Sequence, residues 1–300
     1  MIKTVLGDVK KQDLGVTLAH EHICCYSEYL YKIANDKYLD KCKLINTASD
    51  YLALLKEKYG LNTLVDCTPV NLGRDVDLLK NISEKSGVNI VCSTGFYYTD
   101  EPVLYNMPAA LLTDYMIEDA RKVNAGIIKC AVENENISEF NQKLLRVFAS
   151  VHKALGLPIV IHTNADNQNG LKALSILLSE GVKPSAITVG HLSDTEDFDY
   201  IRHIAESGCF IGLDRIYDIY SSEYISSKIK MINKLCQAGF DDRIILSHDA
   251  LFFNGFDEKP EINEKPRLSY SFDNILPLLP THFSNEVMTV NPKRMLCCGD

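Results

Sequence analysis

The stretch Thr17-Leu18-Ala19-His20-Glu21-His22-Ile23 joins an apolar run to two histidines that stand two residues apart. In an extended strand, residues i and i+2 point to the same face, so His20 and His22 would direct their imidazoles to one point. Neutral imidazole is the side chain that binds metals most often. Most such pairs are ordinary surface or core histidines. The motif indicates a metal site only together with the potential ligands in the segments that follow it.

Eight short apolar runs recur along the chain and predict strands that are buried on both faces. They lie at residues 16–20, 63–68, 89–94, 126–132, 158–163, 186–191, 210–214 and 243–247. Between and after them come helical patterns, at residues 75–82, 140–155, 171–178, 272–279 and 284–288. This alternation predicts an α/β fold, a (β/α)8 TIM barrel formed by residues 1–300 as a single domain. A doubly wound open sheet is the competing architecture, but its usual glycine-rich first turn is missing.

Potential metal ligands stand at the C-terminal ends of five of these runs, where (β/α)8 barrels carry their chemistry. They are His20, His22, Lys129, His162, His191 and Asp249. Six ligands are too many for one tetrahedral zinc. We therefore expect a two-metal site, in which metals about 3.5–4 Å apart activate a bridging hydroxide. Taken singly, each residue has an ordinary alternative, such as a core histidine, a buried lysine ion pair or an aspartate that caps a helix.

Lys129 is the unusual member of this set, because an ammonium group cannot bind a cation. Burial and nearby positive charge both favour the neutral amine. A neutral amine can add carbon dioxide and form a carbamate, whose two oxygens can bridge two metals. We therefore expect a carbamate on Lys129.

Composition limits the other classes of function. The 300 residues are 46% hydrophobic and carry a net charge of -9, which argues against a nucleic-acid-binding protein. No apolar run is long enough for a membrane span, and residues 1–8 lack the apolar core of a signal peptide. We expect a cytoplasmic protein with reduced thiols among its ten cysteines. Cys24 and Cys25 follow His22 closely, and a role at the mouth of the metal site stays open.

The sequence resembles the phosphotriesterase family of the amidohydrolase superfamily over nearly its whole length. Besides the His20 motif, the resemblance rests on segments that begin at Gly73, Gly126, His162, Gly190, Ile211, Ser247 and Asn291. It implies that His20, His22 and Asp249 hold the more buried metal and that His162 and His191 hold the more exposed one. The metals would be zinc, or cobalt, manganese or iron, and the protein would be a homodimer.

Within the family, the chain resembles the lactonases more than the dedicated phosphotriesterases. Tyr97, in Thr94-Gly95-Phe96-Tyr97, stands where a lactonase tyrosine faces the metals, and the chain has no Trp. Arg215 replaces a histidine of the phosphotriesterases and is expected to pair with Asp194. The resemblance therefore implies an enzyme that hydrolyses lactones, with a weaker action on phosphotriesters. The ordinary alternative is that Tyr97 and Arg215 only support the rim.

The expected mechanism uses the exposed metal as a Lewis acid on the lactone carbonyl, while the bridging hydroxide attacks the carbonyl carbon. Asp249 would take the proton and deliver it to the leaving alkoxide, and Tyr97 would donate a hydrogen bond as charge develops. Aromatic residues of the last two loops would form the pocket wall. They are Tyr217, Tyr220, Tyr224, Phe252, Phe253, Phe256 and Tyr270.

Three other functions stay open at this point. The first is a phosphotriesterase proper. The second is a lactonase for phosphorylated sugars, which the basic residues Lys259, Lys265 and Arg267 of the last loop keep open. The third is a metal-bound binding protein without catalysis, although a member that has lost its activity should lack one of the six ligands.

Overall fold

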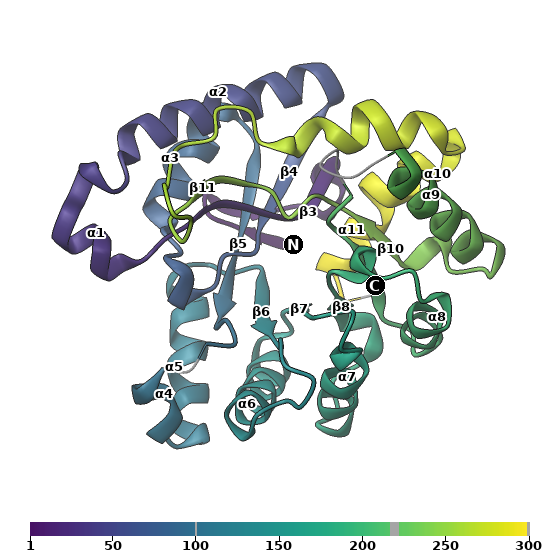
Figure 1. The fold of residues 1–300 in the computed structure, drawn as a ribbon. Coiled ribbons are helices and arrows are strands. Elements are labelled where there is room, and N and C mark those ends of the chain that lie inside the picture. Colours follow the sequence, from purple (N-terminus) through teal and green to yellow (C-terminus); the bar gives the residue numbers. More distant parts are fainter. Residues whose placement is uncertain (100, 217–221, 299–300) are drawn as a thin grey trace.

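The barrel strands follow one another in chain order, and each is parallel to its neighbour (Figure 1). The computed structural model describes residues 1–99, 101–216 and 222–298. All eight predicted runs form strands, so the barrel prediction is confirmed. The strands are β3 (Val16–Cys25), β4 (Leu61–Asp66), β5 (Asn89–Gly95), β6 (Ile127–Ala131), β7 (Ile159–His162), β8 (Ile187–Val189), β9 (Phe210–Leu213) and β10 (Ile244–Leu246).

A further strand, β11 (Leu251–Asn254), brings the last barrel strand to the first. It follows β10 closely and pairs in parallel with β3, with Leu251 opposite His22. Directly before this strand, the amide of Asp249 donates to the carbonyl of His20 at 3.1 Å, and the carbonyl of Ala250 accepts from the amide of His22 at 2.9 Å. The competing open-sheet architecture is therefore wrong.

Helices surround the strands, as Figure 1 shows. They are α1 (Glu28–Ala34), α2 (Lys41–Tyr59), α3 (Val76–Ser86), α4 (Pro102–Asn106), α5 (Ala109–Lys122), α6 (Glu139–Leu155), α7 (Asn169–Ser179), α8 (Phe198–Glu206), α9 (Ser222–Gln237), α10 (Thr281–Asn285) and α11 (Asn291–Leu296). A hairpin of β1 (Ile2–Thr4) and β2 (Gly7–Val9) precedes the barrel. In the part of the chain that the structure describes, no helix is long and apolar enough to cross a membrane.

The predicted helices at residues 75–82, 140–155 and 171–178 are present as α3, α6 and α7. The segment near residues 272–279 is helical but forms a π-helix and a 3-10 turn, and the segment near residues 284–288 contains the end of α10 and the start of a π-helix. They contain the π-helices η8 (Ser271–Ile275) and η10 (Glu286–Val290) and the 3-10 turn η9 (Leu276–Leu278). Pro277 lies inside η9 and lacks an amide hydrogen, so a continuous α-helix is not favoured there. The other 3-10 turns are η1 (Lys11–Asp13), η2 (Asn35–Lys37), η3 (Val70–Leu72), η4 (Pro184–Ala186), η5 (Leu192–Asp194), η6 (Asp241–Arg243) and η7 (Arg267–Ser269).

Helix α6 illustrates why these sequences form helices on the outside of the barrel. Ser138 caps its N-terminus by accepting a hydrogen bond from the amide of Asn141. Gly156 ends it in a left-handed conformation, with φ of 69°. Between these caps, the apolar side chains recur at helical spacing and face the strands. They are Phe140, Leu144, Val147, Phe148 and Val151.

The strands separate two apolar cores. The larger core lies between the strands and the helices. The smaller one fills the barrel interior with one inward-facing residue from most strands, and residues of the two chain termini join it. Its buried members are Ile2, Leu14, Ala19, Val65, Cys67, Val91, Ile127, Val160, Phe210, Ile245, Met295 and Leu296. The barrel is thus packed inside, so chemistry must take place at one of its ends, and (β/α)8 barrels carry it at the C-terminal end.

Candidate metal centre

Lys129 and His162 lie next to the apolar interior core of the barrel, on the side of its C-terminal end. Ile127 and Val160 belong to the interior core, and Lys129 and His162 follow two residues later on β6 and β7. Alternate strand residues share a face, so both side chains point toward the barrel axis. Both are buried. The strands therefore bring an amine and an imidazole to the same end of the barrel.

His20 and His22 reach this point through an irregularity in β3. The pairing register between β3 and β4 shifts between Leu18 and Glu21. Ala19 belongs to the interior core, although it directly precedes His20. A local bulge of this kind allows two successive residues to lie on one side of a sheet. This bulge directs His20 and His22 toward the barrel axis, above the apolar interior core.

His191 and Asp249 stand in left-handed backbone conformations, with φ of 63° and 53°. Residues other than glycine rarely adopt this region, and such residues cluster at functional sites. Gly190 leaves room for Asp214 and His20, because a Cβ there would lie 3.0 Å from Oδ2 of Asp214 and 3.2 Å from Cε1 of His20. The backbone is thus shaped around the side chains that meet at the axis.

One group of candidate ligands gathers around Asp249. Its Oδ1 lies 3.1 Å from Nε2 of His22 and 3.7 Å from Nε2 of His20. One ligand atom from each of these three residues lies within 4.8 Å of the others. Nζ of Lys129 lies 2.6 Å from Nε2 of His20. His20, His22 and Asp249 are close enough to share a cation, and the amine of Lys129 lies beside them.

Asp214 contacts the outer nitrogens of two imidazoles, those of His20 and His191. It was not predicted as a site residue from the sequence. Its Oδ1 lies 2.9 Å from Nδ1 of His191, and its Oδ2 lies 2.5 Å from Nδ1 of His20, out of line for a good hydrogen bond. A carboxylate against Nδ1 fixes the tautomer of a neutral ring and leaves the Nε2 lone pair facing forward. A second group of candidate ligands, His20, His191 and Asp214, meets the same distance criterion.

His162 and His191 face each other in a way that fits a cation between or beside them. Nδ1 of His162 lies 2.8 Å from Nε2 of His191. The remaining ring nitrogens bind carboxylates, Glu133 behind His162 and Asp214 behind His191. If both outer nitrogens carry the proton, two lone pairs point at one another at this short distance. Such a pair is repulsive without a metal or a shared proton, so these residues fit the metal that the donor set implies.

The pKa values of three imidazoles favour the neutral form that binds metals. Burial lowers the pKa of His191 to about 3. It also lowers the pKa of His162. Burial and the nearby Lys129 lower the pKa of His20. These rings need not lose a proton before a metal binds.

His22 differs from the other three. Burial opposes its charged form, but Cys25 and Asp249 outweigh burial and raise the pKa of His22 to about 10, so a metal would displace a proton there. Its Nδ1 lies 2.9 Å from the hydroxyl of Thr68 and 3.7 Å from the thiol of Cys25. Cys25 lines the cavity above the cluster, whereas Cys24 packs in the outer core.

Glu21, between the two histidines of the motif, fixes the loop that carries Asp249. Its Oε1 accepts hydrogen bonds from the hydroxyl of Ser247 at 2.8 Å and from the amide and Nδ1 of His248 at 2.9 and 2.8 Å. Its Oε2 accepts from the amide of Ala250 at 2.9 Å. A buried carboxylate with four donors is well satisfied, so the pair of Glu21 and His248 is a structural clamp.

Arg215 joins two acids at the rim. Its Nε donates to Oδ2 of Asp249 at 2.8 Å, and its Nη1 donates to Oδ2 of Asp194 at 2.8 Å. Burial alone would raise the pKa of Asp249, but His191, His22 and Arg215 hold it well below its usual range. The sequence-predicted contact between Arg215 and Asp194 is present, and Asp249 is ionised at neutral pH.

Tyr97 and Glu133 approach the same nitrogen of His162. The hydroxyl of Tyr97 lies 3.4 Å from Nε2, and Oε2 of Glu133 lies 2.8 Å from it. The hydrogen bond from His162 lowers the pKa of Glu133 to about 2. Burial raises the pKa of Tyr97, so its phenol keeps its proton. No pattern in the sequence points to Glu133, because its partner is 29 residues away.

A cavity of about 390 Å3 opens above the cluster. Its lining combines the polar groups with apolar side chains. The lining residues are His22, Cys25, Pro69, Leu72, Tyr97, Thr99, Lys129, His162, His191, Arg215, Asp249, Leu251, Asn254 and Phe256. Five of the six sequence-predicted ligands thus face one space, and His20 lies beneath it.

The expected aromatic wall is only partly present. Phe256 lines the cavity, but Phe252 and Phe253 are buried in β11 and face the outer core, so the expectation for these two is wrong. The reason is that residues 251–254 form a strand rather than a loop. Tyr217 and Tyr220 lie outside the described residues.

The sequence is similar to those of known proteins. The family model described as "Phosphotriesterase family" matches residues 1–296. The chain belongs to the phosphotriesterase family. An aryldialkylphosphatase of Saccharolobus solfataricus is 32% identical, over 95% of this chain and 96% of that protein. A phosphotriesterase homology protein of Mycobacterium tuberculosis is 31% identical over 87% and 83% of the two chains, and the human N-acetyltaurine hydrolase is 27% identical over 83% of each.

Members of the phosphotriesterase family are hydrolases that depend on two metal ions, and this chain is a metal-dependent hydrolase of that family. The His/Asp groups at the end of its barrel are the candidate metal ligands. The expected fold and family are confirmed.

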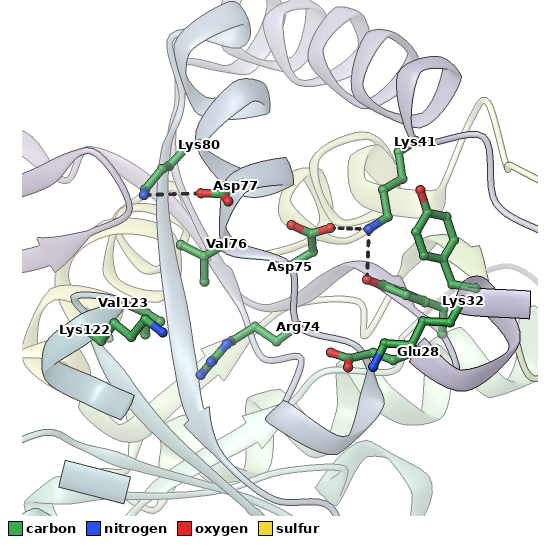
Figure 2. Close-up of a pocket in the computed structure, with 12 residues that line it drawn as sticks. Glu28, Lys32, Lys41, Arg74, Asp75, Val76, Asp77, Lys80, Lys122 and Val123 are labelled. Carbon is green, nitrogen blue, oxygen red and sulfur yellow. Dashed lines mark hydrogen bonds and ion pairs between the residues drawn. The ribbon is translucent and has the colours of Figure 1, made fainter. Parts of the chain in front are cut away.

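Another cleft, of about 490 Å3, lies on the outside of the barrel and holds none of the candidate ligands (Figure 2). Its charged residues largely pair with one another, as Lys41 does with Asp75 at 2.7 Å. Arg74 donates two hydrogen bonds to Asp119, at 2.7 and 2.8 Å, and one to the carbonyl of Ser93. The phosphotriesterase-family segment around Arg74 therefore supports the fold rather than the metal centre.

Proposed function

We propose that this protein opens lactone rings at a binuclear metal centre. The observation that supports this most is the meeting of six potential ligands at the C-terminal end of the barrel, below a cavity of about 390 Å3. Enzymes with this fold carry out their chemistry at that end. The six residues are His20, His22, Lys129, His162, His191 and Asp249.

One metal would be held by His20, His22 and Asp249, and the other by His162 and His191. Zinc is the metal that we expect, since it binds imidazole and carboxylate ligands readily. When bound, the two metals polarise the substrate carbonyl and make a water molecule acidic enough to react at neutral pH.

Lys129 would join the two halves of the centre as a carbamate. Its amine is buried and lies 2.6 Å from Nε2 of His20, so an ammonium group would face the ligands rather than solvent. Addition of carbon dioxide to the neutral amine forms an N–C bond and releases one proton. The product is an anion with two ligand oxygens.

Asp249, Arg215 and Tyr97 would handle protons and charge. Asp249 is ionised and can accept a proton from water, then return it to the ring oxygen as the lactone opens. Arg215 holds Oδ2 of Asp249 at 2.8 Å and so directs Oδ1 toward the ligands. Tyr97 lines the cavity and can donate a hydrogen bond to the carbonyl oxygen as negative charge develops.

The cavity supports a lactone with a short apolar substituent. Leu72, Leu251 and Phe256 contribute apolar surface, and Tyr97 is a hydrogen-bond donor at its wall. A phosphotriester could meet the same metals, and the aryldialkylphosphatase relative keeps that activity as the alternative. We propose that it is the weaker of the two.

A phosphorylated sugar lactone is a second candidate. A polar cavity of about 460 Å3 adjoins the first, and the two share Asp249, Leu251 and Asn254. Lys265 and Arg267 line it and could attract an anionic group, whereas Lys259 does not line it. Asp257 and Glu261 line the same cavity and would weaken this attraction.

The test is a substrate panel with protein loaded with zinc, cobalt or manganese in the presence of bicarbonate. The panel contains γ- and δ-lactones, phosphorylated sugar lactones and paraoxon, and N-acetyltaurine because of the N-acetyltaurine hydrolase relatives. We expect the highest kcat/KM on one of the lactone classes. A higher kcat/KM on paraoxon or on the amide would refute the lactonase proposal and leave the metal centre standing.

We also propose that the chain forms one domain and assembles as a homodimer. The first rests on the alternation of strands and helices along the whole chain, and the second rests on the family alone. Light scattering of the purified protein tests the second, and a mass of one chain would contradict it.

A further inference from the structure

Glu133 is a charged residue at the rim that the proposed mechanism does not use. It follows β6, and its side chain is 32% exposed. Its Oε2 lies 2.8 Å from Nε2 of His162, and its Oε1 accepts a hydrogen bond from Asn164 at 2.9 Å. Asn167 donates to its main-chain carbonyl at 3.0 Å. Glu133 is therefore held in place from the loop that follows β7.

The orientation of the His162 ring decides which of its atoms faces His191. Its inward-facing nitrogen is Nδ1, which lies 2.8 Å from Nε2 of His191. Rotation of the ring by 180° about the Cβ–Cγ bond would exchange the positions of Nδ1 and Cδ2. Both orientations are accessible to histidine in general. Tyr97 packs against one face with ring centroids 5.0 Å apart, but its hydroxyl is 3.4 Å from Nε2 and holds the ring only weakly.

We propose that Glu133 is a positioning residue that sets the orientation and tautomer of His162, so that Nδ1 presents its lone pair to the more exposed metal. The hydrogen bond from Nε2–H to Oε2 makes Nε2 the protonated nitrogen. It also leaves the hydroxyl of Tyr97 without a donor role toward His162, so Tyr97 can donate into the cavity. This inference rests on the proposed two-metal centre.

The test measures metal retention by the full-length zinc-loaded protein during titration with a chelator, with zinc counted per chain. In Glu133→Ala we expect one of the two metals to bind about 10–100-fold more weakly, as for other lost partners of metal-binding histidines. The second metal should be retained as in the wild type. Glu133→Gln keeps an acceptor for Nε2–H and should restore most of the affinity.

Glu135→Ala is the matched control, since Glu135 is exposed, lies two residues away and carries the same charge. We expect it to retain both metals as the wild type does. Thermal unfolding of the metal-free variants confirms that each one folds. The absorption spectrum of cobalt-loaded Glu133→Ala should also change, because the geometry of one site changes.

Two outcomes would overturn the inference. One is a Glu133→Ala variant that holds both metals as tightly as the wild type. The other is a Glu133→Gln variant that is as weak as Glu133→Ala, because the hydrogen-bond acceptor would then not be what matters. A wild-type protein that binds no metal would instead refute the proposed two-metal function.

Discussion

Nε of Arg215 donates a hydrogen bond to Oδ2 of Asp249 at 2.8 Å, so the guanidinium holds the oxygen of Asp249 that does not face His22. Nη1 of the same guanidinium donates to Oδ2 of Asp194, also at 2.8 Å. This link fixes the direction in which Asp249 presents its other oxygen, and it stabilises the ionised carboxylate. Under the proposed mechanism, both the position and the charge of Asp249 matter.

Asp249→Asn should lower kcat for the best lactone by about 10²–10⁴-fold, the range for loss of an acid–base group. The amide can still offer an oxygen to a metal but cannot take up a proton. Zinc counted per chain separates loss of metal from loss of the base. A variant with both metals and more than a tenth of the wild-type kcat would contradict the role of Asp249.

Arg215→Met should shift the acidic limb of the profile of kcat/KM against pH to higher pH. Arg215 helps to hold the pKa of Asp249 below its usual range, so its removal raises that pKa. The base form of Asp249 exists above its pKa and is lost as pH falls through it. Activity would therefore be lost at a higher pH than in the wild type. An unshifted limb would show that Arg215 does not act through the charge of Asp249.

Tyr97→Phe should lower lactone turnover by about 10²–10³-fold, as for the loss of one hydrogen-bond donor to a developing charge. Tyr98→Phe is the control, because its ring packs against Tyr97 at 4.4 Å but it does not line the cavity. Steady-state kinetics of the two variants on one lactone make the comparison. Equal rates for Tyr97→Phe and the wild type would reduce Tyr97 to a packing residue.

Glu21→Ala should destabilise the metal-free protein by about 3–5 kcal/mol, since it leaves buried partners of a carboxylate unpaired. Those partners are the amide and ring of His248, the hydroxyl of Ser247 and the amide of Ala250. Urea unfolding measures the change, and Glu28→Ala, at an exposed position, is the control. A loss below about 1 kcal/mol would show that Glu21 is not the clamp for this loop.

Local patterns made the barrel and its ligand-bearing ends predictable. A run such as Ile159-Val160-Ile161-His162 is apolar on both faces, and only a strand buried on both sides needs that. Its final residue, His162, then lies at the C-terminal end of the barrel, where polar residues commonly take part in catalysis or metal binding. The helix α2 (Lys41–Tyr59) was missed because it buries only a narrow face, formed by Leu44, Ala48, Ser49, Leu52 and Leu55.

The supporting residues of the site could not be predicted in the same way. Asp214, Glu133 and Glu21 act through hydrogen bonds to residues that are far away in sequence, as Glu21 does to His248 across 227 positions. Only the closed barrel brings such partners together. Strand β11, which buries Phe252, could not be predicted either, because its pairing with β3 depends on closure of the barrel.

Anomalous diffraction from crystals of the zinc-loaded protein, grown with bicarbonate, would locate the metal ions that the proposed function requires. We expect two zinc peaks at the C-terminal end of the barrel. His20, His22 and Asp249 should surround one, His162 and His191 the other, and carboxylate density should extend from Nζ of Lys129 between them. Zinc bound elsewhere, or no zinc at these residues, would contradict the metal centre. Two zinc ions beside an unmodified Lys129 amine would contradict the carbamate.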